Sequence, residues 1–90
     1  MIPVPERRNR PRYSVSEVVE VYVAGADGRF IGCGVLRDIC DTGAGIHIDV
    51  PIAPGTVVEL CNEKGSLRAV CRHTKYAYVM YVSGFEFLDG

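Results

Sequence analysis

The chain has 90 residues, of which 48% are hydrophobic and 23% charged, and its formal net charge is −1. This length holds one small domain, and the composition excludes a disordered chain. No apolar run is long enough to span a bilayer, and the N-terminal residues lack the apolar stretch of a signal peptide. We therefore expect a cytoplasmic protein with reduced thiols and no membrane partner.

The first 13 residues differ from the rest of the chain in charge and in periodicity. The stretch "ERRNRPRY" (residues 6–13) holds four arginines, and three prolines lie within the first dozen residues. This segment has neither helical nor strand periodicity, which predicts a flexible arm over residues 1–13 and a folded domain over residues 14–90. Charge alone leaves open whether the arm is a solvated tail, a nucleic-acid arm or a phosphate clamp.

The folded part consists of short runs of β-branched and aromatic residues, separated by turn signals such as "GADG", "PIAPG" and "TKYA". These runs predict strands near residues 17–24, 29–39, 44–49, 56–61, 67–74 and 78–87. In "GIHIDV", Ile46 and Ile48 alternate with His47 and Asp49, so this strand has one apolar and one wet face. Six antiparallel strands can hide such a face by closing on themselves. We therefore expect an all-β fold, a small six-stranded antiparallel β-barrel.

Catalytic groups are scarce. His47 and His73 are both predicted on strands, where a lone histidine is more often a surface side chain than a general base, and the acidic residues are scattered singly. We therefore expect that the protein is not an enzyme.

The four cysteines give only a weak metal signal. Cys33 and Cys40 lie seven positions apart on one predicted strand, which sends them to opposite faces unless a bulge intervenes. Cys61 and Cys71 flank the "NEKGS" hairpin and are able to approach each other, but two thiols without further ligands rarely hold zinc. Small core residues are the favoured interpretation, and we expect neither a metal nor a cofactor.

The stretch "DICDTGAGI" (residues 38–46) ends one predicted strand and begins the next, so it presents Asp38 and Cys40 at the barrel rim. A purely structural interpretation is available, in which Asp38 and Thr42 bond to backbone groups while Gly43 and Gly45 supply positive φ angles. The stretch alone does not decide between such a connection and a ligand-binding loop.

An arginine-rich arm followed by this loop inside a small barrel resembles the PilZ domain family. The arm motif of that family, R-x-x-x-R with a further arginine often before it, matches Arg7, Arg8 and Arg12. The second motif, [D/N]-x-S-x-x-G, matches Asp38, Cys40 and Gly43, with cysteine in place of serine. The "GAGI", "PIAPGT" and "SGFEFL" stretches also look like PilZ sequence, so the resemblance covers nearly the whole chain.

The resemblance implies a receptor for cyclic di-GMP, a bacterial second messenger that governs motility and biofilm formation. It assigns phosphate and guanine contacts to Arg8 and Arg12, because a guanidinium group pairs with phosphate, bonds to guanine or stacks on its face. Asp38 suits the donors on the Watson–Crick edge of guanine, and Gly43 leaves room for close approach. Arg7 would assist, and as an additional cation it implies two ligands per chain. An arm that folds onto the rim would signal to a partner effector protein.

Two other interpretations stay open. In the first, the barrel is a protein-interaction adaptor with weak or no nucleotide binding, which Cys40 in place of serine supports. In the second, the arm is a non-specific nucleic-acid contact. The rest of the chain is net negative and lacks a basic stripe interleaved with aromatic residues, so we expect no nucleic-acid partner.

Overall fold

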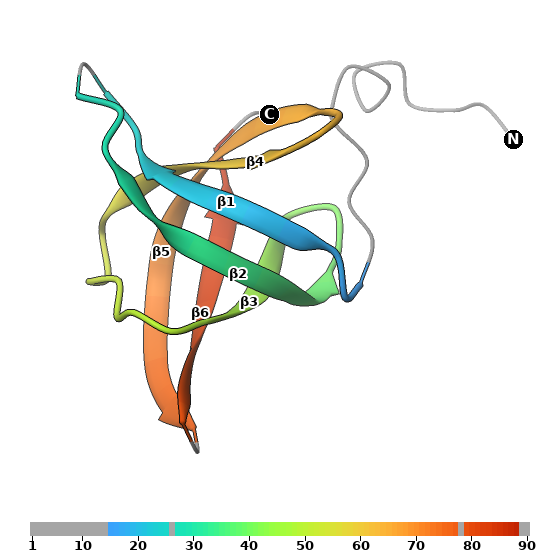
Figure 1. Ribbon diagram of the computed structural model, residues 1–90, viewed down its shortest axis with the longest axis vertical. Coiled ribbons are helices and arrows are strands. Elements are labelled where there is room, and N and C mark those ends of the chain that lie inside the picture. Colours follow the sequence, from blue (N-terminus) through green and yellow to red (C-terminus); the bar gives the residue numbers. More distant parts are fainter. Residues whose placement is uncertain (1–14, 26, 78, 89–90) are drawn as a thin grey trace, which may run out of the picture.

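The computed structural model describes residues 15–25, 27–77 and 79–88, and the predicted arm at residues 1–13 lies outside them. The regular elements are β1 (Val18–Val23), β2 (Phe30–Ile39), β3 (Gly43–Ile48), β4 (Val57–Asn62), β5 (Gly65–Ala77) and β6 (Met80–Phe87). They close into a barrel in the order β1-β2-β3-β6-β5-β4, with every neighbouring pair antiparallel (Figure 1). Across these residues there is no helix, and so none that could cross a membrane. The predicted six-stranded barrel is confirmed.

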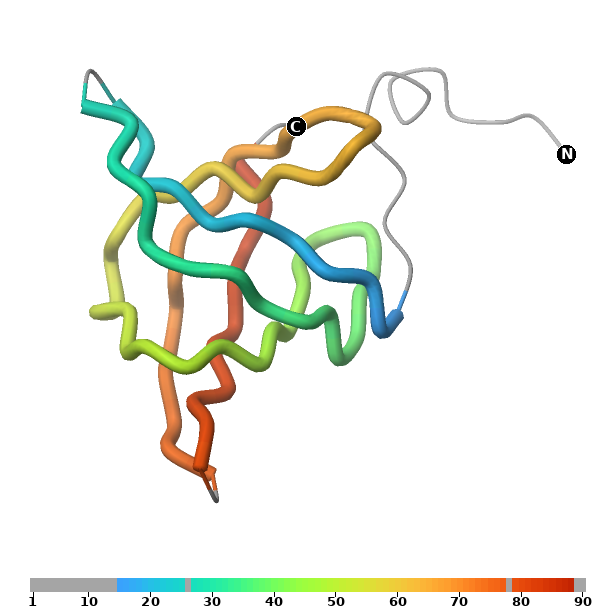
Figure 2. Tube along the Cα trace, in the orientation of Figure 1, coloured from blue at the N-terminus to red at the C-terminus, as the bar shows by residue number. Residues whose placement is uncertain are grey.

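The barrel interior is filled by alternate side chains from all six strands, because successive residues of a strand point to opposite faces. The largest of these side chains, each less than 2% exposed, are Val19, Val21, Leu36, Ile46, Ile48, Val58 and Leu60. Ile52, from the connection between β3 and β4, joins the same cluster. Burial of each such side chain contributes about 1.5–3 kcal/mol. The six strands run around this interior (Figure 2).

Strand β5 is longer than the sequence predicted. The sequence indicated a strand over residues 67–74 and a turn in "TKYA", whereas β5 continues to Ala77. Its pairing with β6 continues through Lys75↔Val82, Tyr76↔Tyr81 and Ala77↔Met80. The rings of Tyr76 and Tyr81 meet edge to face with centroids 5.0 Å apart, which supports this extension. The β5–β6 hairpin therefore extends beyond the other strands (Figure 1).

A bulge in β2 turns Asp38 outward. Leu36 pairs with Ile46 while Asp38 pairs with Gly45, so Arg37 is an extra residue in β2. One extra residue reverses the faces of everything that follows it. Uninterrupted alternation from the buried Leu36 would send Asp38 into the core, and the bulge instead puts it on the outer surface.

A second bulge, in β5, does the same for His73. Cys71 pairs with Phe85 and His73 pairs with Gly84, so Arg72 is the extra residue. Cys71 is fully buried, and alternation without the bulge would bury His73 as well. With the bulge, His73 is exposed on the outside of the barrel.

The first bulge corrects the prediction for Cys33 and Cys40. The two thiols were expected on opposite faces, but both are exposed, because the bulge at Arg37 reverses the alternation between them. After the bulge it is Ile39 that packs against the core, which leaves Cys40 outside. The bulge that was stated as the one exception to this prediction is therefore present, at Arg37.

The expectation that Cys61 and Cys71 could approach each other is wrong. Cys61 pairs with Ser66 across the β4–β5 hairpin, whereas the Cys71 backbone N–H donates to the carbonyl of Thr56. Cys71 is a buried core residue, as predicted, and Cys61 is half-buried. Within the described part of the chain, no three His, Cys, Asp or Glu side chains gather closely enough to hold a metal ion.

Candidate functional site

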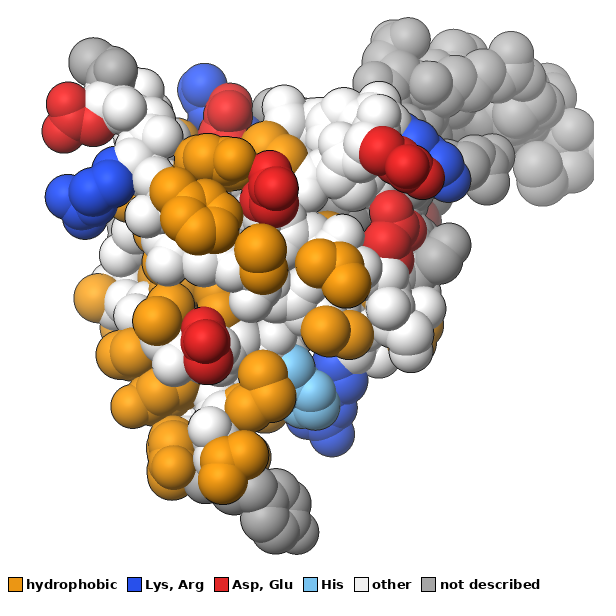
Figure 3. All heavy atoms as spheres, in the orientation of Figure 1, with side chains coloured by type: hydrophobic (Ala, Val, Ile, Leu, Met, Phe, Trp, Pro, Cys, Tyr) orange, Lys and Arg blue, Asp and Glu red, His pale blue; other side chains and the backbone are white. Residues whose placement is uncertain are grey.

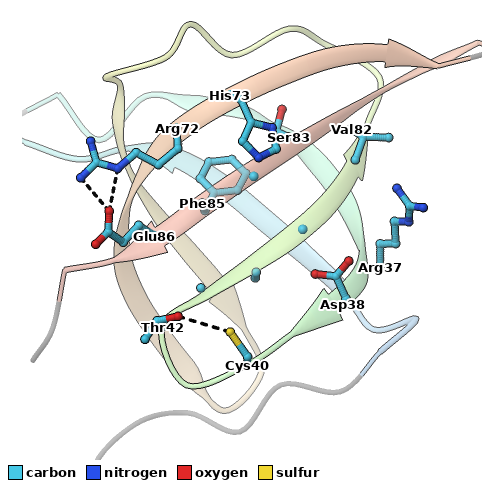
Figure 4. Close-up of a pocket in the computed structure, with 14 residues that line it drawn as sticks. Arg37, Asp38, Cys40, Thr42, Arg72, His73, Val82, Ser83, Phe85 and Glu86 are labelled. Atoms are coloured by element: carbon cyan, nitrogen blue, oxygen red, sulfur yellow. Dashed lines mark hydrogen bonds and ion pairs between the residues drawn. The ribbon is translucent and has the colours of Figure 1, made fainter.

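A hollow of about 470 Å³ lies on the outer surface of the barrel, where β2, β3, β6 and β5 adjoin. Its residues come from both bulges, from the connection between β2 and β3, and from the outward positions of β3 and β6 (Figure 4). The stretch that the sequence singled out at residues 38–46 therefore forms one side of the hollow, and β5 forms the other.

The floor of the hollow is backbone. Gly45 and Gly84 pair with each other across β3 and β6, and they occupy the two central positions of a row that continues to Asp38 on one side and His73 on the other. Glycine within a strand weakens the strand and often marks a place where a ligand or another backbone approaches closely. Two paired glycines on the outer face leave a flat strip between two polar side chains.

The side chains of Asp38 and His73 lean over this strip from opposite sides (Figure 4). A Cβ atom at Gly45 would lie 3.0 Å from Oδ1 of Asp38, and a Cβ atom at Gly84 would lie 2.3 Å from Nε2 of His73. Each side chain thus occupies the space that the neighbouring glycine leaves open. The Asp38 carboxylate has no hydrogen bond or ion pair with another of the described residues, so it is an available acceptor.

Gly43 has a structural reason to be glycine. A Cβ atom there would lie 2.2 Å from the carbonyl oxygen of Phe85, a backbone atom of the neighbouring strand. Neither Gly43 nor Gly45 has a positive φ, and both lie within β3 rather than in a turn. The structural interpretation in which these glycines supply positive φ is therefore wrong, and the loop ends before Gly43.

Cys40 lies at the rim of the hollow with its Sγ 3.4 Å from Oγ1 of Thr42 (Figure 4). The hydrogen bond with the Thr42 side chain, together with those from the backbone of Thr42 and Gly43, lowers the pKa of the Cys40 thiol below its ordinary value. Hydrogen bonds of this kind favour the charged form of a thiol. The position thus combines a small polar group with an environment suited to an anion.

The charges that line the hollow cancel. Arg72 and Glu86 form an ion pair in which both Nε and Nη2 lie 2.6 Å from Oε1, and both side chains are more than half exposed. Such a pair adds little stability. Arg37 is the other cation and Asp38 the other carboxylate, and the guanidinium of Arg37 points away from that carboxylate (Figure 4). Two arginines against two carboxylates leave no net charge to attract a multiply charged anion.

The structure brings together three of the six residues that the sequence predicted as a site. Asp38, Cys40 and Gly43 all line the hollow. The other three, Arg7, Arg8 and Arg12, lie outside the described residues.

Sequence reasoning missed His73 and the floor glycines Gly45 and Gly84. The available signal was a glycine at an outward position in each of two predicted strands, which marks a close approach. His73 carried no signal, because its outward direction depends on the bulge at Arg72.

A family model described as "PilZ domain" matches residues 6–90, a range that includes both predicted motifs. No curated protein and no solved structure matches the chain.

Proposed function

The chain belongs to the PilZ domain family, and we propose on this basis that the hollow between Asp38 and His73 binds cyclic di-GMP. Members of the family are receptor domains for cyclic di-GMP and are generally not enzymes. The observation that carries the proposal is the glycine floor with an available carboxylate at its edge. A planar base needs a flat surface and a directional partner, and this row offers both.

Asp38 fits guanine better than adenine. The Watson–Crick edge of guanine presents a ring N–H and an exocyclic amine, two donors that one carboxylate accepts side by side. Adenine has no ring N–H on that edge and would leave one carboxylate oxygen without a partner. His73, across the floor, is near enough to stack on the base or to donate a hydrogen bond to it.

The balance of charge supports a role for the arm. Cyclic di-GMP carries two phosphodiester charges, and the hollow itself supplies no net positive charge to offset them. The motif arginines Arg7, Arg8 and Arg12 supply that charge in our proposal, with Arg8 and Arg12 as the main contacts. Arg7 would allow a second, stacked ligand molecule, because four phosphate charges in one site require a further cation.

The remaining interpretation is a PilZ adaptor that binds proteins and little or no nucleotide. The observation in its favour is Cys40, since a thiol is a weaker hydrogen-bonding group than the serine hydroxyl of the family motif. In our proposal this substitution weakens one contact and leaves binding intact, and the ligand-bound protein signals to a partner.

Isothermal titration calorimetry with cyclic di-GMP tests the proposal. We expect micromolar binding, about −8 kcal/mol. Asp38→Ala should weaken binding at least tenfold. Asp49 is an exposed carboxylate that directly follows β3 and does not line the hollow, so Asp49→Ala should bind as the wild type does. Cyclic di-AMP and a short DNA duplex at two salt concentrations serve as further ligands. Absence of heat with cyclic di-GMP at hundredfold excess would support the adaptor interpretation, and binding of DNA with steep salt dependence would support a nucleic-acid role.

A further inference from the structure

A second surface feature lies beside the nucleotide hollow, one register row further along the same strands. Val18 pairs with Val35, Val35 with His47, His47 with Val82 and Val82 with Lys75, so these five outward positions form one row across β1, β2, β3, β6 and β5. Four strand spacings give the row a length of about 19 Å. Figure 3 shows hydrophobic side chains on this face from β1 and β2 down toward the β5–β6 hairpin, with single acidic side chains among them.

The row deepens into a hollow of about 330 Å³ at its hairpin end. Its lining is Arg37, His47, Ala77, Val79, Met80 and Val82. Val79 is 83% exposed, and Val18 at the other end of the row is 59% exposed. We call the row and this hollow together the apolar surface. Apolar side chains in such a continuous arrangement mark interaction sites, and the length of the row suits an extended peptide segment of five or six residues rather than a small metabolite.

The hollow at the hairpin end of the apolar surface has a basic edge. Arg37, His47 and Lys75 lie there, and none of the described residues that line the hollow is acidic. The exposed Glu20 and Asp49, two positions after Val18 and His47, lie beside the rest of the row. Among the described residues, Arg37 forms no ion pair. An apolar hollow with an unneutralised cation at its edge is complementary to a segment that carries both aliphatic and acidic side chains.

We propose that the apolar surface docks a segment of another protein that combines aliphatic residues with aspartate or glutamate. The aliphatic side chains fill the hollow against Val79, Met80 and Val82, and the carboxylates pair with Arg37 and Lys75. Such a segment is the chemical class of partner that this face recognises.

The two hollows share residues, so their occupants interact. Arg37 and Val82 line both of them. This step rests on the proposed function: cyclic di-GMP adds two negative charges beside Arg37 and draws its guanidinium toward the phosphates, which removes one cation from the acidic segment. Docking and nucleotide binding therefore oppose each other, and a rise in cyclic di-GMP releases the segment.

The probe for this proposal is a displayed library of random twelve-residue peptides, selected on the full-length protein. Enriched peptides are synthesised, and their affinity is measured by fluorescence anisotropy for the wild type and three variants. Val79→Asp places a carboxylate in the hollow, Arg37→Gln removes the shared cation, and Phe30→Asp is the matched control at an exposed apolar position outside the apolar surface. Circular dichroism melting checks that each variant folds.

Enriched peptides should be rich in aliphatic and acidic residues. Val79→Asp should weaken their binding at least tenfold and Arg37→Gln about fivefold, while Phe30→Asp binds as the wild type does. No enrichment, or enriched peptides that bind Val79→Asp as well as the wild type, would overturn the proposal. A dimer in sedimentation velocity that Val79→Asp disrupts and Phe30→Asp does not would identify a second copy as the occupant instead.

Two readouts separate this proposal from the nucleotide proposal. Saturating cyclic di-GMP should lower peptide affinity of the wild type at least threefold, and Val79→Asp should bind the nucleotide unchanged in calorimetry. Peptide docking without any nucleotide binding would refute the nucleotide site and leave the docking surface. Nucleotide binding without an effect on the peptide would refute the coupling through Arg37.

Discussion

Alanine substitutions at two glycines of β3 should affect different properties, one the stability of the fold and the other the affinity for the ligand. Gly43 and Gly45 are two residues apart on the same face of one strand, and neither has a positive φ, so alanine is compatible with the backbone at both. Their surroundings differ. The new Cβ of Gly43→Ala would lie 2.2 Å from the carbonyl oxygen of Phe85, whereas that of Gly45→Ala would lie 3.0 Å from Oδ1 of Asp38, the tip of a side chain.

The distances decide the expected magnitudes. For Gly43→Ala, β3 and β6 must separate by about 1 Å at the centre of a four-stranded face, an overpacking that costs about 1–3 kcal/mol of unfolding free energy. For Gly45→Ala, the Asp38 carboxylate needs to move only a few tenths of an ångström. The lower entropy of the unfolded chain offsets that cost by about 0.4–1 kcal/mol, so stability should stay near that of the wild type. The same methyl group covers half of the glycine floor and shifts the proposed guanine acceptor, and we expect at least a tenfold loss of affinity, about 1.4 kcal/mol.

Urea denaturation gives the unfolding free energies, and calorimetry with cyclic di-GMP gives the affinities. Gly43→Ala should shift the denaturation midpoint with an unchanged slope, and Gly45→Ala should change affinity alone. If Gly45→Ala binds as tightly as the wild type, the glycine floor is not the base-binding surface. If Gly43→Ala is as stable as the wild type, the close approach of β3 to Phe85 does not constrain the fold.

Three further predictions concern the arm and the rim. Arg8→Ala and Arg12→Ala should each weaken cyclic di-GMP binding by about 1.5–3 kcal/mol in calorimetry, the range for hydrogen bonds to charged groups. Neither should lower the melting temperature of the free protein, and a lower melting temperature would mean that the arginines support the fold. Because the pKa of Cys40 is lowered, its thiol loses its proton at a lower pH than an ordinary thiol does, and the thiolate repels the phosphates. Affinity should therefore fall as pH rises through that pKa, and the fall should be absent in Cys40→Ser; parallel pH profiles would contradict this. Arg7→Leu should reduce the stoichiometry from two ligands per chain to one, and a wild-type stoichiometry of one, with protein of verified active concentration, would refute the role assigned to Arg7.

Most of the barrel was predictable because its signals are local. Strand boundaries follow turn residues, and the inward faces follow the alternation of apolar residues such as Ile46 and Ile48. The error at the end of β5 has a tertiary cause, since "TKYA" has turn-like composition and is held in a strand by its partners on β6.

The candidate site was only half predictable, for the same kind of reason. Asp38 and Cys40 belong to a motif with fixed spacing, which a sequence displays directly. The outward direction of His73 depends on the bulge at Arg72, and a bulge depends on the register between two strands that meet only after folding. Gly84 was visible in the sequence, but its position opposite Gly45 was not.

The two arginines of the hollow, Arg37 and Arg72, are the extra residues of the two bulges. Each is one inserted residue in a strand whose other pairings continue on both sides of it. Deleting the codon for Arg72 would restore simple alternation with His73 still opposite Gly84 on the outer face, so the hollow would lose only the Arg72–Glu86 ion pair while the strand order stays intact. A barrel without these two residues would keep Asp38 and His73 on either side of the glycine floor, so what the two bulges add to the hollow is its pair of arginines.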